Sequence, residues 1–303
     1  MTASEVVVVA NPAAGRGKGG RLIGKVGRML HEAGVPHAFR VSGSADGLTE
    51  QVRRAADDGV GTIAVLGGDG SVGLAANGIL DTGATLAVLP SGTGDDFAHS
   101  LGVGSLGAAV RALADPNVVP IDVVRVTTGT ERRVYVNVAG AGFDSDVTEA
   151  ANAMRLGLGP TGTYIASVVK TLSRFVPAGY RVQLDDEVVE GPHMLVVVAN
   201  AVSYGGGMKV APRASVVDGC LDVLLLRALG KGAFLRAFPK VFRGTHVRHP
   251  AVTMATARTV AIETDRRVQV YADGERVGPL PARFEVLPAA LPIVVGVNPR
   301  AIP

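Results

Sequence analysis

The sequence has no tryptophan, a single cysteine and few aromatic residues, and each shortage excludes a class of protein. Because Cys220 is alone, the chain forms no internal disulfide, which fits a reducing, cytoplasmic setting. Aromatic residues make up 4% of the chain, too few to supply a base-stacking surface, so we expect no nucleic-acid partner. The six histidines form no cluster with the spacing of zinc ligands.

Long hydrophobic runs and a strong excess of one charge are also missing. No run approaches the roughly 18 apolar residues of a membrane-spanning helix. Glu5 stands where a signal peptide would carry positive charge. The net charge of +3 by itself selects neither nucleic acid nor membrane. We expect a globular cytoplasmic protein that contacts a membrane at its surface at most, and the sequence leaves a homodimer open.

The first 120 residues alternate short apolar runs with helical patterns. Strands are expected at 6–10, 37–41, 62–66 and 86–89, and helices at 21–33, 49–57 and 72–79. This order predicts an N-terminal three-layer α/β domain built around a parallel sheet. Ligands of such sheets bind beyond the carboxyl ends of the strands.

Beyond Asp122 the pattern changes to strands, which predicts a C-terminal antiparallel β-sandwich-like domain. Strands are expected at 134–139, 180–184, 194–199, 221–226, 259–263, 268–271 and 283–286, and helices at 144–155, 162–175 and 231–243. We therefore divide the chain into domains 1–122 and 123–303. No flexible linker separates them, so we expect close docking, with room for the last residues to pack back on the first domain.

Three glycine-rich segments each follow an apolar strand of the first domain. The first, 11–20, leaves backbone N–H groups unshielded and leads into a helix, which favours phosphate. Gly15, Gly17 and Gly20 match the dinucleotide spacing, but no acidic residue closes the next strand, and no Lys-Ser or Lys-Thr pair makes a P-loop. The segment therefore predicts phosphate binding, but it matches neither the dinucleotide-binding motif nor the P-loop.

The second segment, Leu66-Gly67-Gly68-Asp69-Gly70-Ser71, places one carboxylate among glycines where a strand turns into a helix. Asp69 suits a water-linked magnesium, and the glycines let phosphate approach the main chain. A tight turn with a helix cap is the alternative. The third segment, Pro90-Ser91-Gly92-Thr93-Gly94-Asp95-Asp96-Phe97, repeats the pattern after the next strand, which favours phosphate binding over caps alone.

Together these motifs resemble the catalytic domain of the diacylglycerol kinase and sphingosine kinase family, in particular its bacterial soluble lipid kinases. The resemblance continues through Tyr204-Gly205-Gly206-Gly207-Met208, Asp218-Gly219-Cys220-Leu221-Asp222-Val223 and Asp273-Gly274-Glu275, so it covers nearly the whole chain. Asp95 departs from it, because the family commonly has asparagine there.

The resemblance implies a role for each matching residue. It assigns ATP to Asn11, Gly15, Gly17, Ser42, Gly67, Gly68, Asp69, Gly70, Ser71 and Thr93. It assigns a magnesium–water network to Asp69, Asp96 and Asp122, and a structural magnesium to Asp218 with the carbonyls of Ser215 and Cys220. Asp273 would accept the proton of the attacked hydroxyl. From spacing alone, Asp-Gly at 273–274 and 218–219 is equally a hairpin turn.

The implied reaction is transfer of the γ-phosphate of ATP to a lipid hydroxyl, with diacylglycerol as the first expectation and Mg²⁺ as the metal. Sphingosine, ceramide, a NAD kinase-like reaction and a non-catalytic nucleotide-binding regulator are the alternatives. The helix expected at 231–243 groups Arg236, Lys240 and Arg243 opposite its apolar side. It either rests on anionic lipid or packs between domains with a solvated basic face.

Overall fold

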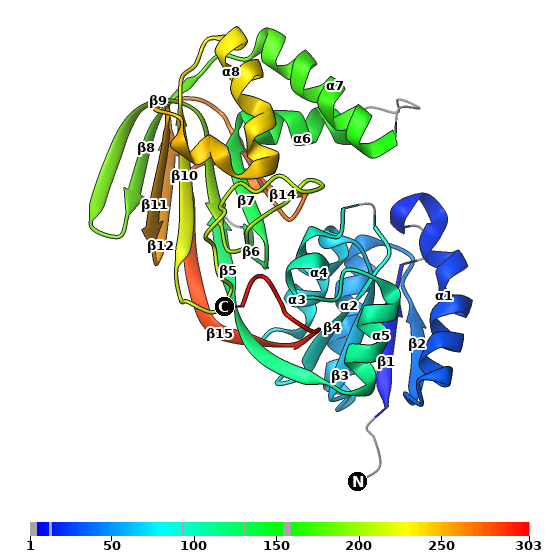
Figure 1. The fold of residues 1–303 in the computed structure, drawn as a ribbon. Helices are drawn as coiled ribbons and strands as arrows, with labels where there is room; N and C mark the ends of the chain where they lie inside the picture. The colour runs from blue at the N-terminus through cyan, green and yellow to red at the C-terminus, as the bar shows by residue number, and fades with distance from the viewer. Residues whose placement is uncertain (1–4, 12–13, 93, 130, 154–158, 303) are drawn as a thin grey trace.

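The computed structural model describes residues 5–11, 14–92, 94–129, 131–153 and 159–302. Its N-terminal part is a parallel sheet with the strand order β4-β3-β1-β2 (Figure 1). Contacts pair α1 with α5 on one side of this sheet and α2 with α3 on the other, so the predicted three-layer domain is confirmed. The elements are β1 (Val6–Ala10), α1 (Ala14–Glu32), β2 (His37–Val41), α2 (Ala45–Asp57), β3 (Thr62–Gly67), α3 (Asp69–Ile79), β4 (Thr85–Pro90), α4 (Asp96–Ser100) and α5 (Leu106–Ala114).

The second part is an antiparallel β-sandwich-like domain, as the strand-rich sequence predicts. Its strands are β5 (Asn117–Thr128), β6 (Glu131–Tyr135), β7 (Val138–Gly142), β8 (Ala178–Leu184), β9 (Glu187–Ala199), β10 (Leu221–Arg227), β11 (Val252–Ala257), β12 (Thr259–Thr264), β13 (Gln269–Ala272), β14 (Glu275–Pro279) and β15 (Ala282–Val295). At one end lie α6 (Phe143–Ala153), α7 (Gly159–Arg174) and α8 (Lys231–Ala237), followed by the 3₁₀ segments η1 (Phe238–Arg243) and η2 (Thr245–Arg248) (Figure 1).

Three local predictions need correction. The expected strand 134–139 is broken after Tyr135 into β6 and β7. The expected helix 231–243 is α-helical only to Ala237. Pro239 ends the α-helix because it has no N–H to donate and because its ring would clash with the preceding turn. The expected glycine loop 11–20 is largely helical, since α1 already begins at Ala14.

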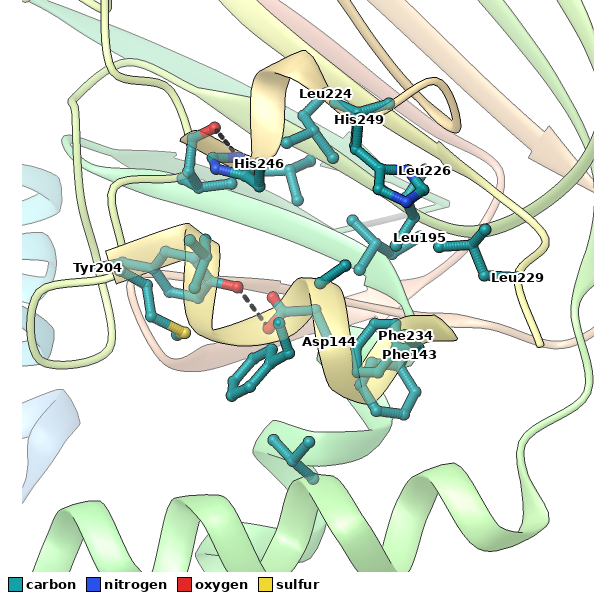
Figure 2. Close-up of a pocket in the computed structure, with 18 residues that line it drawn as sticks. Phe143, Asp144, Leu195, Tyr204, Leu224, Leu226, Leu229, Phe234, His246 and His249 are labelled. Carbon is teal, nitrogen blue, oxygen red and sulfur yellow. Dashed lines mark hydrogen bonds between the residues drawn. The ribbon is translucent and has the colours of Figure 1, made fainter. Parts of the chain in front are cut away.

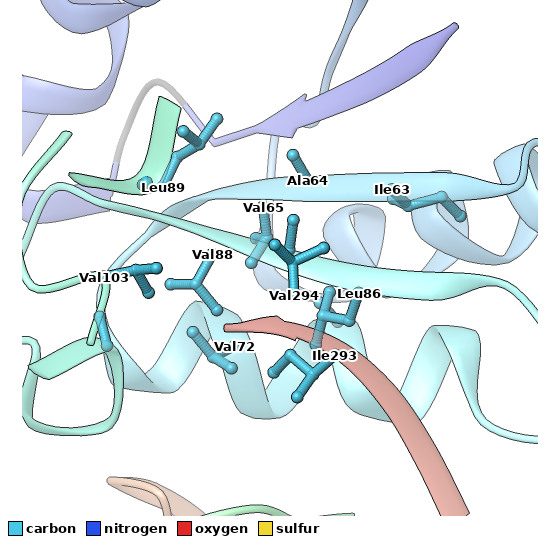
Figure 3. Close-up of a cluster of buried hydrophobic side chains, with 14 of the residues drawn as sticks. Ile63, Ala64, Val65, Val72, Leu86, Val88, Leu89, Val103, Ile293 and Val294 are labelled. Atoms are coloured by element: carbon cyan, nitrogen blue, oxygen red, sulfur yellow. The ribbon is translucent and has the colours of Figure 1, made fainter. Parts of the chain in front are cut away.

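Two long strands join the halves. β5 and β15 pair over most of their length, and the predicted boundary at Asp122 falls inside β5. β15 then pairs in parallel with β4, and its end packs into the core of the first domain (Figure 3). Ile293 and Val294 lie there with Val72, Leu86 and Val88. The last strand therefore fixes the second domain against the first.

Candidate active site

A polar cleft of about 430 Å³ lies where β3 and β4 lead into α3 and α4. The two glycine-rich loops meet in it so closely that side chains would not fit. A Cβ on Gly92 would lie 3.0 Å from the Cα of Gly68, and one on Gly67 only 2.3 Å from the Oγ of Ser71. Main chain therefore forms much of the wall, as phosphate binding requires.

Asp69 begins α3 and links the two loops. Its carboxylate accepts hydrogen bonds from the backbone N–H groups of Asp96 (3.2 Å) and Phe97 (3.0 Å). Burial raises the pKa of Asp69 to about 6; the two amides lower it, and the nearby Asp96 carboxylate raises it further. Its charged form is therefore disfavoured by burial, and a nearby cation would stabilise that form.

Asp96 connects this loop to the second domain. The residue is buried, its Oδ2 accepts from the backbone N–H of Gly206 (2.6 Å), and the hydroxyl of Ser203 lies 3.5 Å from its Oδ1. The glycine-rich segment from Tyr204 to Met208 therefore acts as an interdomain contact. The sequence shows this segment as a motif, but it does not show that the segment contacts Asp96, because Gly206 and Asp96 lie more than 100 positions apart.

Asp273 occupies the β13–β14 turn, with φ of 49° at Asp273 and 84° at Gly274. These left-handed values are those of a tight hairpin, so the turn interpretation is correct as far as the backbone goes. The carboxylate nevertheless points toward the first domain. A Cβ placed on Gly73 of α3 would lie 2.8 Å from its Oδ2.

Three consecutive backbone N–H groups hold that carboxylate: those of Val136 (2.9 Å), Asn137 (3.0 Å) and Val138 (3.2 Å). They are available because the expected strand breaks between β6 and β7, which turns its amides toward Asp273. Burial raises the pKa of Asp273 to about 7, the three amides oppose the rise, and the charge of Asp69 adds to it. This pKa suits a base that works near neutral pH.

A smaller hollow lined by Asp273 lies beside the cleft. Gly70, Leu74 and Glu275 line both spaces, and Arg133 lines the smaller one. Asp69, Asp95 and Glu275 bring negative charge to the larger cleft, and its lining within the described ranges includes no lysine or arginine. A bound triphosphate would therefore need a cation between itself and these acids.

Asn77 is a residue that sequence reasoning missed. Its side-chain amide donates to the carbonyl of Val134 (2.7 Å) and to that of Gly73 (2.8 Å), and its carbonyl oxygen accepts from the N–H of Val134 (2.9 Å). It thereby ties α3 to β6 just before the strand break. No motif marks a helical asparagine of this kind in the sequence.

Asp122 lines a different hollow from Asp69. Its buried carboxylate accepts from the backbone N–H groups of Gly219 (2.7 Å) and Ala289 (2.8 Å), and it lines a separate hollow with Asp218. Each of its two oxygens accepts one main-chain N–H. Asp122 therefore holds the Asp218 loop in place, and its part in a magnesium–water network stays a prediction.

The loop expected to hold a structural magnesium precedes β10. The exposed Asp218 accepts from the N–H of Cys220 (3.0 Å), and the hydroxyl of Ser215 donates to the carbonyl of Ala301 (3.3 Å). Burial, together with Asp218, raises the pKa of Asp222 to about 6. Within the described ranges no three His, Cys, Asp or Glu side chains gather as metal ligands. One carboxylate with main-chain carbonyls still fits a hard cation.

The remaining predicted nucleotide contacts lie in different parts of the first domain. Asn11 lines the cleft. Ser42 is buried, with its N–H donating to the carbonyl of Ala10 (2.9 Å), so it closes the β1–β2 pairing and does not line the cleft. Gly15 and Gly17 lie in the first turn of α1, and Thr93 is outside the described residues.

A second, apolar pocket lies in the C-terminal domain under α8 and η1 (Figure 2). Phe143, Leu195, Leu224 and Phe234 contribute to its walls. At one side the hydroxyl of Tyr204 donates to the Asp144 carboxylate (2.6 Å). Tyr204 belongs to the same glycine-rich segment that contacts Asp96, so this segment links the apolar pocket to the polar cleft.

Each of the two domains matches a known protein family. Residues 5–126 match the family model described as the diacylglycerol kinase catalytic domain, and residues 137–295 match the YegS C-terminal NAD kinase beta sandwich-like domain. A protein named diacylglycerol kinase from Mycobacterium tuberculosis is 34% identical over 296 residues, covering 96% of this chain and 94% of its own. One of the same name from Bacillus subtilis is 27% identical, with 91% of each chain covered.

A protein of Shewanella frigidimarina named probable lipid kinase YegS-like is 28% identical and covers 89% of this chain and 87% of its own. The crystal structure of a putative diacylglycerol kinase from Bacillus anthracis superposes with a TM-score of 0.79 over 98% of this chain and 99% of its own, at 24% identity, which supports the fold. The chain belongs to the diacylglycerol kinase family of lipid kinases. The resemblance seen in the motifs is thereby confirmed.

Proposed function

We propose that this protein transfers the γ-phosphate of ATP to the free hydroxyl of diacylglycerol, forming phosphatidic acid. The observation that supports this most strongly is the position of Asp273. A carboxylate from the second domain lies against α3 of the first, beside a cleft walled by bare main chain. In a kinase, a carboxylate beside the transferred phosphoryl group accepts the proton of the attacking hydroxyl. Nucleotide binding alone does not require a carboxylate at this position.

The reaction needs positioning and one proton transfer. The lipid oxygen forms a bond to the γ-phosphorus while the bond to the β–γ bridging oxygen breaks, and ADP leaves with that electron pair. The hydroxyl proton passes to Asp273. The three amides from Val136 to Val138 fix the orientation of the acceptor carboxylate.

Magnesium fits this cleft on charge grounds. Burial raises the pKa of both Asp69 and Asp95, and Glu275 lines the same space. A hard divalent cation would be held by Asp69 through water and would neutralise charge on the transferred phosphate. The residues present therefore suit a Mg²⁺–ATP complex better than free ATP.

The apolar pocket supports a lipid acceptor. Its walls are mostly aliphatic and aromatic side chains, with Asp144, His246 and His249 among them. The segment from Tyr204 to Met208 joins it to Asp96 beside the cleft. An acyl chain in this pocket would leave its glycerol end near the interdomain cleft. This arrangement favours an acylated alcohol over NAD, which has no long apolar part.

The test is a transfer assay with γ-labelled ATP and Mg²⁺ against four acceptors presented in neutral detergent micelles or buffer: short-chain diacylglycerol, sphingosine, ceramide and NAD. The expected result is labelled phosphatidic acid from diacylglycerol at the highest kcat/KM. Preferential labelling of sphingosine or ceramide would reassign the acceptor within lipid kinases. Labelling of NAD alone would overturn the proposal.

A further inference from the structure

Asn200 stands directly after β9, and its side chain is completely buried. The side-chain amide nitrogen donates to two carbonyl oxygens, that of Val136 (2.9 Å) and that of Asp122 (3.0 Å) on β5. Because a carbonyl oxygen only accepts, the amide nitrogen and not the amide oxygen has to face both of them. Asn200 therefore ties β5 to the break between β6 and β7, where Val136 lies.

The main chain at the same position holds the next carbonyl of the break. The backbone N–H groups of Asn200 (2.9 Å) and Ala201 (3.1 Å) both donate to the carbonyl oxygen of Asn137. Val136 and Asn137 are the two residues between β6 and β7. Both carbonyl groups of the break are thus bound by residues 200–201.

Each of these carbonyls shares a rigid peptide unit with an N–H that binds the Asp273 carboxylate. In a planar trans peptide unit the C=O and the N–H point in opposite directions. The unit with the carbonyl of Val136 carries the N–H of Asn137, which donates to Asp273 (3.0 Å). The unit with the carbonyl of Asn137 carries the N–H of Val138, which also donates to Asp273 (3.2 Å). Fixing the carbonyl end of each unit therefore fixes the direction of its N–H.

The two ends of such a unit also reinforce each other electrically. A hydrogen bond to the C=O polarises the peptide unit and makes its N–H a stronger donor. These N–H groups favour the ionised form of the buried Asp273, which burial disfavours. In the described part of the chain, the charged or titratable groups that line the same hollow or interact with this charge are Asp69 of α3, Arg133 and Tyr135 of β6 and Glu275 of β14.

We propose that Asn200 is a positioning residue of phosphoryl transfer, which holds the two peptide units of the break so that their N–H groups orient the Asp273 carboxylate. Asn200 lines neither the cleft nor the apolar pocket, so it acts through the main chain. Its role differs from that of Asn77, which binds β6 before the break. The inference rests on the proposed function, because it takes Asp273 as the base.

The test begins with the kinetics of Asn200→Ala on short-chain diacylglycerol and Mg²⁺–ATP. We expect kcat at pH 7 to fall about tenfold or more, because a small misplacement of a catalytic group can cost about 10²-fold. The KM for ATP should stay unchanged, since Asn200 does not line the cleft. The midpoint of the kcat/KM profile should move upward, because less well fixed amides stabilise the ionised carboxylate less.

A buried side chain on the same strand gives a matched control. His193 is buried on β9, and its Nδ1 donates to the carbonyl of Gly191 (3.0 Å). His193→Ala should lose stability in urea unfolding, as Asn200→Ala should, but keep the wild-type kcat and pH midpoint. Circular dichroism checks the fold. If Asn200→Ala does not fold, Asn200→Ser, which keeps a hydroxyl donor, takes its place with a smaller expected loss of kcat.

A double-mutant cycle with Asp273→Asn separates positioning from a general structural role. Adding Asn200→Ala to Asp273→Asn should lower kcat no further, because the base that Asn200 orients is already absent. An equal fold loss in both backgrounds would overturn the inference. Loss of activity in Asp273→Asn together with an unchanged kcat in Asn200→Ala would overturn it too and leave the proposed function intact. Near-normal turnover by Asp273→Asn would instead contradict the assignment of the base.

Discussion

At the scale of single residues, the turn at Asp273 shows how one residue serves structure and chemistry together. Its backbone adopts the left-handed conformation of a hairpin, and its carboxylate accepts three amides from a strand break in the same domain. Asp185 offers a natural comparison. It has the same φ of 49° in the β8–β9 turn, but backbone hydrogen bonds from Arg258 and Thr259 lower its pKa. Burial of the carboxylate, and not the turn, therefore raises the pKa of Asp273 toward the value that the proposed base needs.

Replacement of Asp273 by asparagine should keep the fold and remove the proton acceptor. We expect Asp273→Asn to lower kcat by at least about 10²-fold with little change in the KM for ATP, by the usual magnitude of general-base catalysis. Asp185→Asn is the matched control and should leave kcat unchanged. Near-normal turnover by Asp273→Asn would remove this residue from its role.

The pKa of Asp273 also predicts a pH dependence. Because the base must be ionised, kcat/KM should rise about tenfold per pH unit below about 7 and level off above it. The folded-state pKa is raised above the ordinary value of 3.8, so ionisation of Asp273 should reduce the free energy of unfolding as pH rises toward about 7. A flat kcat/KM profile across this range would contradict the assignment.

The surroundings of Asp95 predict the effect of Asp95→Asn, which introduces the residue that the family commonly has at this position. Its φ of 49° suits aspartate and asparagine alike, and an asparagine oxygen could still accept the N–H of Gly92 (3.0 Å). Removing one negative charge from an acidic cleft should lower the KM for Mg²⁺–ATP about fivefold. Asp81→Asn, at another left-handed position, is the control and should have no effect. An unchanged or higher KM in Asp95→Asn would exclude this electrostatic effect.

At the scale of elements, the break between β6 and β7 creates the site. Successive amides of an unbroken strand point alternately to its two sides, so the three consecutive N–H groups of Val136, Asn137 and Val138 could not all reach the Asp273 carboxylate. Asn77 of α3 holds the end of β6 by two hydrogen bonds to Val134. Asn77 therefore holds α3, which lines the cleft, against the end of β6, which leads to the amides that bind Asp273.

Loss of that side chain should affect both stability and catalysis. Asn77→Ala leaves the polar groups of Val134 unpaired, so we expect the free energy of unfolding to fall by about 1–3 kcal/mol. We also expect kcat to fall, because the neighbouring amides lose their fixed position. Gln183→Ala removes an exposed amide that donates to the carbonyl of Asp185 (3.0 Å) and is the control in urea unfolding. Equal stability of the two variants would show that Asn77 is not an interdomain tie.

Much of the element pattern could be predicted because buried strands and helical periodicity are local signals. β1 and β2 coincide with their predicted ranges, whereas α1 begins at Ala14, well before Arg21. Glycines suggested a loop there, but a helix tolerates them when its packing compensates. Pro239 is a local signal that the expected helix 231–243 should have included.

The candidate site was harder to predict, because it depends on contacts between distant segments. The motifs identify Asp69, Asp96 and Asp273, but not that Gly206 donates to Asp96 or that Asn77 binds Val134. The partners of Asp122 could not be predicted for the same reason: Gly219 and Ala289 are separated from it by about 100 residues or more. Spacing along the chain contains no information about such pairs.

At the scale of the whole molecule, the loop at Asp218 lies near the long β5–β15 pair that joins the domains. Asp122 of β5 fixes this loop through Gly219, and Ala289 belongs to β15. A cation bound by Asp218 would therefore stabilise the connection between the two halves. Within the described ranges no helix is long and apolar enough to span a membrane.

Magnesium should raise the melting temperature through this loop. A ligand that binds only the folded state stabilises it in proportion to its concentration above Kd. We expect Mg²⁺ without nucleotide to raise the Tm of wild type, and Asp218→Ala to abolish most of that rise. Asp186→Ala, an exposed aspartate in the β8–β9 turn, is the control. An identical rise in Asp218→Ala and wild type would count against a structural cation here.

The central claim is that two domains build one phosphoryl-transfer site, and a crystal structure with Mg²⁺ and a non-hydrolysable ATP analogue tests it most directly. We expect the triphosphate between the loops at Gly67–Ser71 and Pro90–Gly94, with its γ-phosphate directed toward the hollow at Asp273. A triphosphate bound outside this cleft, or a γ-phosphate directed away from the Asp273 carboxylate, would contradict it.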